Sequence, residues 1–203
     1  MVGRTSIERP PPRDDILICE KRYGQPDLVL RSPAYTQKGN AMDAWYKPVV
    51  ATGLTEDRWV RAIEMRPGTI KGRKITHHAL ARLQQNDGDT GASIVPGGDD
   101  PGPGLFMEWA VGKQGEIMRE NSGKLMLPGS SIVWDIHYHA VGEEITDTVE
   151  MAVYFYPKGQ EPKYRQALSL YSGITGGNRN LDIPPNSLTV TQGFHVMKKA
   201  GRA

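Results

Sequence analysis

The sequence predicts an all-β fold, an antiparallel β-sandwich or jelly roll formed as a single domain with long loops. Short apolar runs rich in β-branched and aromatic residues recur along the chain, and 23 glycines and 15 prolines punctuate them. Regularly spaced short strands separated by turn residues are typical of sandwiches and jelly rolls. At 203 residues, the chain is long enough to bury a core without disulfides or a structural metal.

Six apolar runs are expected to be strands, at 27–31, 58–65, 75–83, 105–111, 131–141 and 147–157. Segment 84–104, rich in glycine, proline and aspartate, is expected to be a surface loop. Segment 112–130 is interpreted as a turn-rich connection that ends in a Pro-Gly turn. Core packing is expected of three tryptophans and three methionines: Trp59, Trp109, Trp134, Met107, Met118 and Met126.

Charge and composition exclude several classes of partner. The net charge is +2, and the 25 basic and 23 acidic residues are interspersed, which leaves no basic patch for nucleic acid. No apolar run reaches the length of a membrane span, and the polar, proline-rich start has no signal-peptide core. A single cysteine, Cys19, excludes an internal disulfide and a cysteine-based zinc site.

Four of the five histidines fall in two of the expected strands. His137 and His139 are two residues apart, so they share one face of a strand with Asp135. The adjacent pair His77 and His78 would point to opposite faces of a regular strand, and both can reach one ion only at a bulge or at the strand's end, so a metal site requires a bulge beside Thr76. A cluster of imidazoles without cysteine suits zinc, copper, iron or nickel, and Cu(II) binds most tightly among the divalent ions.

The remaining candidates are weaker. His195 stands alone near the end of the sequence and is expected to be a structural residue. Asp135, Glu64 and Glu108 could orient ligand imidazoles. For Glu64 and Glu108 an ordinary surface or turn carboxylate is the favoured interpretation, whereas for Asp135 the two interpretations are balanced.

Two histidine motifs resemble a known family. The first is RWVRAIEMRPGTIKGRKITHHALARL at 58–83, and the second is GKLMLPGSSIVWDIHYHAVGEEITDTVEMAVYFYP at 123–157. Both are similar to the copper type II, ascorbate-dependent monooxygenases, which include peptidylglycine alpha-hydroxylating and dopamine beta-monooxygenases. The resemblance implies that His77, His78 and His137 bind the family's electron-transfer copper and that His139 lies in an outer shell.

The same resemblance implies a domain organisation. The family has two jelly-roll-like domains with one copper each, and residues 25–180 look like the first. Residues 1–24 are then a linker-like segment, and 181–203 lead into a missing second copper domain. The second domain's His-x-His pair has no counterpart here, and the spacing of Met197 from His195 does not match the family's methionine.

The function implied by the resemblance is that of an electron-transfer copper domain. The complete enzyme would hydroxylate a C–H bond with molecular oxygen, with ascorbate as reductant, and this chain would be a fragment that is inactive alone. Relatives work outside the cytoplasm, so an extracytoplasmic location, periplasmic or secreted, is expected. No catalytic residue is assigned in this chain.

Two alternatives come from other classes. A cupin-like iron or zinc enzyme would use His137, His139 and either Glu143 or Glu144, although the spacing in this segment does not match the cupin motif. A metal-free β-sandwich interaction module would use the 84–104 loop as its contact surface. It predicts histidines that do not converge.

Overall fold

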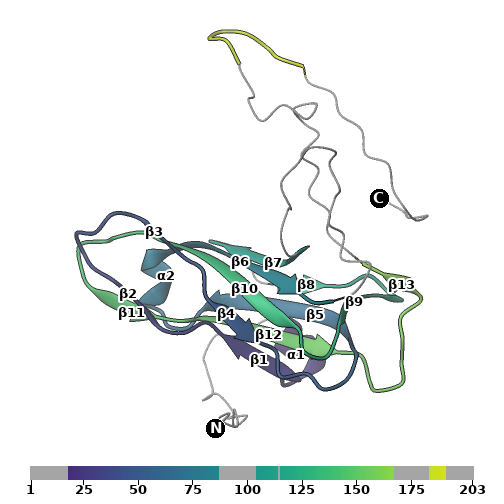
Figure 1. Cartoon of the computed structure of the whole chain (residues 1–203). Coiled ribbons are helices and arrows are strands. Elements are labelled where there is room, and N and C mark those ends of the chain that lie inside the picture. Colours follow the sequence, from purple (N-terminus) through teal and green to yellow (C-terminus); the bar gives the residue numbers. More distant parts are fainter. Residues whose placement is uncertain (1–17, 87–103, 114, 167–182, 191–203) are drawn as a thin grey trace.

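Two mostly antiparallel β-sheets pack face to face around one hydrophobic core (Figure 1). The computed structural model describes residues 18–86, 104–113, 115–166 and 183–190. Within these residues the helices are short, and none has the length and apolar character needed to cross a bilayer. The predicted all-β sandwich is confirmed.

The first sheet has β5 near its centre, flanked by β12 on one side and by β8 and β9 on the other. β5 is the longest strand in the described chain, and both β12 and β9 pair with it in antiparallel register. The strands of this sheet are β1 (Leu28–Arg31), β12 (Val149–Phe155), β5 (Arg58–Pro67), β8 (Gly115–Ile117), β9 (Ser122–Met126) and β13 (Tyr164–Arg165).

The second sheet carries the histidines and follows the order β3-β10-β6-β7, with β4 also paired to β10. Its strands are β3 (Ala44–Tyr46), β10 (Ser131–Tyr138), β6 (Thr76–Gln84), β7 (Gly104–Ala110) and β4 (Val49–Ala51). A small third sheet joins β2 (Tyr35–Gln37) to β11 (Ile145–Asp147), and the two helices are α1 (Ile18–Tyr23) and α2 (Gly72–Ile75).

Alternation along β10 decides which way its histidine points. Ile132, Trp134, Ile136 and Tyr138 are fully buried in the core between the sheets, whereas the residues between them are only half-buried. Because successive strand residues point to opposite faces, His137 lies on the outer face of the second sheet.

All six predicted strands are present, with ends shifted by a few residues. The connection predicted for 112–130 is wrong in part, because it contains β8 and β9. Gly123 explains why β9 was missed: a Cβ there would lie 2.9 Å from the carbonyl oxygen of Val60, so close strand packing requires the residue that usually signals a turn.

Most of the predicted core residues are in the core. Trp109 and Trp134 are buried there, and so are all three methionines, Met107, Met118 and Met126. The prediction for Trp59 is wrong. It is half-buried and lies outside the core cluster, whereas its neighbour Val60, which points to the opposite face of the strand, is fully buried in that cluster.

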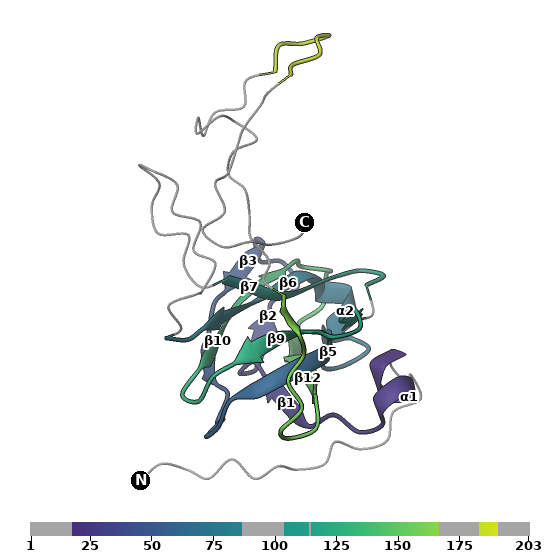
Figure 2. The ribbon, with the colours of Figure 1, turned by 90° about the vertical axis from the view of Figure 1, so that its right-hand side faces the viewer.

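Part of the expected N-terminal linker is a helix. Residues 18–23 form α1, which lies beside the strands of the first sheet (Figure 2) and packs against β5 and β8. Cys19 in this helix is completely buried. Burial, followed by the nearby Glu64 carboxylate, raises the pKa of the Cys19 thiol to about 12.

Glu64 is fully buried beneath this helix, so its interpretation as a surface carboxylate or imidazole partner is wrong. The Tyr154 hydroxyl donates to Glu64 Oε2 over 3.0 Å, and the backbone N–H of Cys19 donates to Oε1 over 2.5 Å. These donors satisfy a carboxylate that would otherwise be costly to bury. Its burial could not be predicted from the sequence, because Glu64 lies on the outer face of the first sheet and the helix α1 that covers it was not expected.

Candidate metal centre

A β-bulge in β6 brings the adjacent histidines to one side of the sheet. His137 of β10 lies opposite His78, but the next residue, Tyr138, lies opposite Thr76, so His77 is the extra residue without a cross-strand partner. Just beyond, the backbone N–H of His139 donates to the carbonyl of Ile75 over 2.7 Å. This is the bulge that the sequence required beside Thr76, and it re-aims a side chain as bulges commonly do.

The turn before β6 is fixed by polar contacts. The Thr76 hydroxyl donates to the Gly72 carbonyl over 2.9 Å, and the Gly72 N–H donates to the Thr69 hydroxyl over 2.9 Å. Asp147, at the end of β11, accepts a hydrogen bond from the Gly68 N–H over 3.1 Å. The segment that delivers His77 and His78 is therefore tied to its neighbours before the strand begins.

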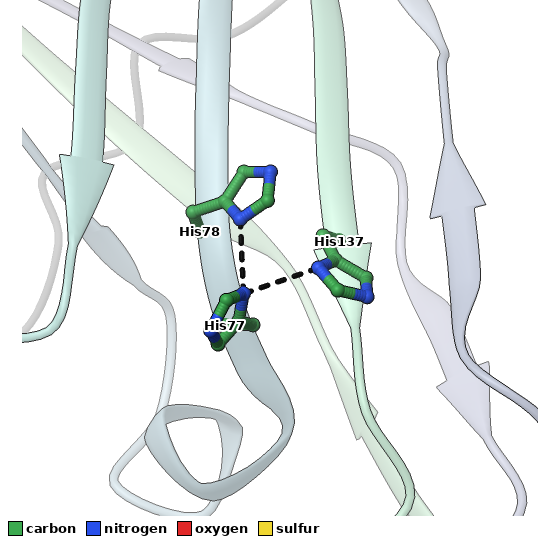
Figure 3. A group of neighbouring side chains, drawn as sticks. All are labelled: His77, His78 and His137. Carbon is green, nitrogen blue, oxygen red and sulfur yellow. Dashed lines mark hydrogen bonds between the residues drawn. The ribbon is translucent and has the colours of Figure 1, made fainter. Parts of the chain in front are cut away.

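Three histidine rings converge on the outer face of the second sheet (Figure 3). His77 Nδ1 lies 3.0 Å from His78 Nδ1 and 3.1 Å from His137 Nδ1. Among the described residues, these three are the group of histidine, cysteine and acidic side chains whose ligand atoms gather closely enough to hold a metal ion, all within 4.8 Å of one another. The predicted set of three ligands is brought together.

The number of N–H groups on these rings favours a bound metal ion over a network of hydrogen bonds among the three imidazoles. A neutral imidazole has one N–H, so the Nδ1 of His77 can act as donor or as acceptor, but not as both. It nevertheless lies about as close to His78 Nδ1 as to His137 Nδ1. Nitrogens bound to one ion at about 2.0–2.1 Å lie roughly 3 Å apart, so these separations fit metal ligands.

Asp43, just before β3, contacts two histidines at once. Its Oδ2 lies 2.9 Å from His137 Nε2, and its Oδ1 lies 2.8 Å from His139 Nδ1. Hydrogen bonds first from His139 and then from His137 lower the pKa of the Asp43 carboxyl, which is therefore ionised at neutral pH. His139 accordingly lies next to the three-histidine cluster and contacts Asp43.

Trp45 of β3 is the cross-strand partner of His137 and stacks on its ring. The ring centroids are 4.3 Å apart and the planes differ by 9°. Trp45 remains 57% exposed, so one face of this large aromatic ring is open to solvent. Asp43 therefore contacts the edge of the His137 ring while Trp45 covers one of its faces, and the two contacts together fix the orientation of the ring.

Sequence reasoning missed both Asp43, which precedes β3, and Trp45 within it. Asp43 lies 94 residues from His137, and the Ala44–Tyr46 run is too short to stand out as a strand. An aspartate two residues before a Trp-Tyr pair is a weak signal, and only the pairing of β3 with β10 shows that it lies beside the histidines.

The electrostatics of the cluster favour neutral ligands. Burial lowers the pKa of His78, and the neighbouring His137 and His77 lower it further, while the Asp135 carboxylate opposes the shift. Because His78 is then neutral at pH 7, it is available to bind a metal without first losing a proton.

The remaining predicted site residues lie apart from the cluster. Asp135 forms an ion pair with Lys47 over 3.2 Å and acts on His78 only through its charge. Glu108 is exposed and pairs with Lys113 over 3.5 Å, which agrees with a surface carboxylate. His195, Met197 and most of the 84–104 loop lie outside the described residues.

The fold and the cluster together define a β-sandwich with a three-histidine site able to hold a metal ion. Comparisons with protein-family models, with curated proteins and with solved structures gave no match. The resemblance to the copper type II monooxygenases therefore rests on the two histidine motifs, and copper and ascorbate stay predictions.

Proposed function

We propose that this chain is the electron-transfer copper domain of a copper- and ascorbate-dependent monooxygenase. The observation that carries the proposal is the convergence of His77, His78 and His137 through a bulge in β6. The two motifs that contain these histidines also carry the family resemblance, so sequence pattern and geometry select the same three residues.

The donor set fits copper. Three imidazole nitrogens without a thiolate or carboxylate suit copper, and among divalent ions Cu(II) binds such a set most tightly. When bound, copper would supply a one-electron couple between Cu(I) and Cu(II). The surrounding protein holds the rings in advance, because the bulge sets His77 and His78 while β3 holds His137.

The position of the cluster suits exchange of electrons with another molecule. The three rings lie on the outer face of the sheet, and His77 is exposed. A small reductant such as ascorbate, or the second copper domain, can therefore approach the ligands without opening the core. C–H hydroxylation by oxygen would take place in that second domain, and the location would be periplasmic or secreted.

The observed contacts disfavour a cupin-like iron or zinc enzyme. A cupin-like site would require His137, His139 and either Glu143 or Glu144 around one ion. His137 instead directs Nδ1 toward His77 while His139 contacts Asp43, and Glu143 is 2.9 Å from Lys74 and 3.7 Å from Lys71. A metal-free interaction module predicted histidines that do not converge, whereas three converge.

Copper loading of the purified chain tests the proposal. We expect one tightly held copper per chain, an electron paramagnetic resonance signal of Cu(II) that ascorbate abolishes, and loss of the copper in both His78→Ala and His137→Ala. Hydroxylation is not expected from this chain alone. Absence of copper binding, or binding that neither substitution affects, would count against the proposed function.

A further inference from the structure

We propose that Asp43 is the positioning residue of the metal centre, orienting His137 so that its Nδ1 faces His77 and His78, and that His139 anchors Asp43 in turn. This inference deepens the proposed function and rests on it for the identity of the ion. It assigns roles to two residues outside the three-ligand set.

The hydrogen bond to Asp43 selects the tautomer of His137. An ionised carboxylate only accepts hydrogen bonds, so the contact of 2.9 Å between Asp43 Oδ2 and His137 Nε2 requires the proton on Nε2. A neutral ring then carries its lone pair on Nδ1, the atom that lies 3.1 Å from His77 Nδ1. The ligand atom is thereby presented before an ion arrives.

Asp43 is itself held at its other oxygen. His139 Nδ1 donates to Asp43 Oδ1 over 2.8 Å, so one carboxylate bridges two imidazoles. The His137 side chain is only 12% exposed, whereas those of Asp43 and His139 are 40% and 61% exposed. A carboxylate this exposed would otherwise rotate among several conformations, and the second hydrogen bond limits that freedom.

The arrangement has the form of a carboxylate–histidine–metal triad. In such triads the carboxylate fixes ring orientation and makes the imidazole a more basic ligand, and its loss typically costs about 10–100-fold in metal affinity. A more electron-rich ligand also favours Cu(II) over Cu(I). Removing the charge of Asp43 is therefore expected to raise the reduction potential as well as weaken binding.

The first arm of the test uses metal-free protein. Long-range ¹H–¹⁵N correlation spectra report which ring nitrogen carries the proton, and His137→Gln assigns the His137 signals. We expect the Nε2–H form of His137 in the wild type and a mixture of tautomers in Asp43→Ala. Asp57→Ala removes an exposed carboxylate just before β5. It is the matched control and should leave the spectrum of His137 unchanged.

The second arm measures Cu(II) and Zn(II) dissociation constants and the copper reduction potential. Asp43→Ala should bind both ions about 10–100-fold more weakly. Asp43→Asn keeps one acceptor oxygen, so it should retain the tautomer but show a smaller loss of affinity and a higher potential. His139→Phe should weaken binding less than Asp43→Ala does.

Two results would overturn the inference: the Nδ1–H tautomer at His137 in the wild type, or wild-type affinity and potential in Asp43→Ala. Neither is the result that defeats the proposed function. That result is a wild-type chain that binds no copper, and the first arm then still decides whether Asp43 orients His137.

Discussion

His77 and His78 are neighbours in sequence, yet their Nδ1 atoms lie 3.0 Å apart on one side of the sheet. On a regular strand the two side chains would face opposite ways. The bulge removes this conflict, because His78 keeps its partner His137 while His77 has none.

Substituting His77 should separate metal binding from folding. His77 is exposed, so we expect His77→Ala to change the free energy of unfolding by no more than about 0.5 kcal/mol while abolishing tight copper binding. Thermal unfolding and copper titration measure the two effects. His139→Ala removes a neighbouring imidazole outside the three-histidine cluster, so it should still bind one copper per chain, with a much smaller loss of affinity than His77→Ala. Tight copper binding by His77→Ala would contradict the three-ligand assignment.

Trp45 should report on occupancy of the site. Because its ring stacks on His137 at 4.3 Å, Cu(II) at the cluster should strongly quench its fluorescence, saturating at one equivalent. In Trp45→Phe the copper-dependent quenching should fall while the affinity stays close to that of the wild type. Trp59 lies on β5 of the other sheet, so copper should quench the fluorescence of Trp59→Phe as much as that of the wild type. Equal quenching in Trp45→Phe and the wild type would place the copper elsewhere.

Acidification should destabilise the metal-free protein through His78. Its folded-state pKa is lowered by burial from an ordinary value of 6.5, so in acid the unfolded chain binds more protons at this residue. This contribution to stability is present above pH 6.5 and is lost as the pH falls through the lowered pKa. Thermal unfolding at pH 8 and pH 5 should show a smaller loss of Tm in His78→Gln than in the wild type. An equal loss of Tm in the two proteins would show that His78 is not a source of the acid sensitivity.

Gly72 should be intolerant of substitution because Asp147 fills the space beside it. A Cβ on Gly72 would lie 1.8 Å from Asp147 Oδ2, so the α2 turn or the carboxylate must move. We expect Gly72→Ala to lower the free energy of unfolding by about 1–3 kcal/mol and to weaken copper binding, since this turn leads into β6. Gly104→Ala is the control, because a Cβ there has no atom within 4 Å. Denaturant unfolding compares the two variants. Equal free energies of unfolding for Gly72→Ala and Gly104→Ala would show that the added Cβ at Gly72 does not clash with Asp147.

Tyr154 should stabilise the fold without affecting the metal centre. Its hydroxyl donates to the buried Glu64, and Tyr154→Phe removes that donor, at an expected cost of about 1–3 kcal/mol. Copper affinity should be unchanged, because Tyr154 lies on β12 of the sheet that carries no ligand. The exposed Tyr164→Phe should be neutral in the same denaturant measurement. A loss of copper affinity in Tyr154→Phe would show coupling between the two sheets.

The sequence by itself determined the fold class, six of the strands and, through the two motifs that carry the family resemblance, the three histidines that converge. Strand alternation put His137 on the face opposite to Ile136 and Tyr138, and the adjacency of His77 and His78 meant that they could share a site only at a bulge or at the strand's end. These features are local, because side-chain direction follows from strand period over a few residues.

Only the tertiary structure decided what surrounds the three histidines. Asp43 and Trp45 reach His137 through the pairing of β3 with β10, and Glu64 is buried because α1 covers the outer face of the first sheet. Such contacts join residues dozens of positions apart, and no local period records which distant strands will pair. The spacing of the histidines therefore indicated a shared site, and the family resemblance indicated His77, His78 and His137, whereas the residues around these three rings depend on long-range packing.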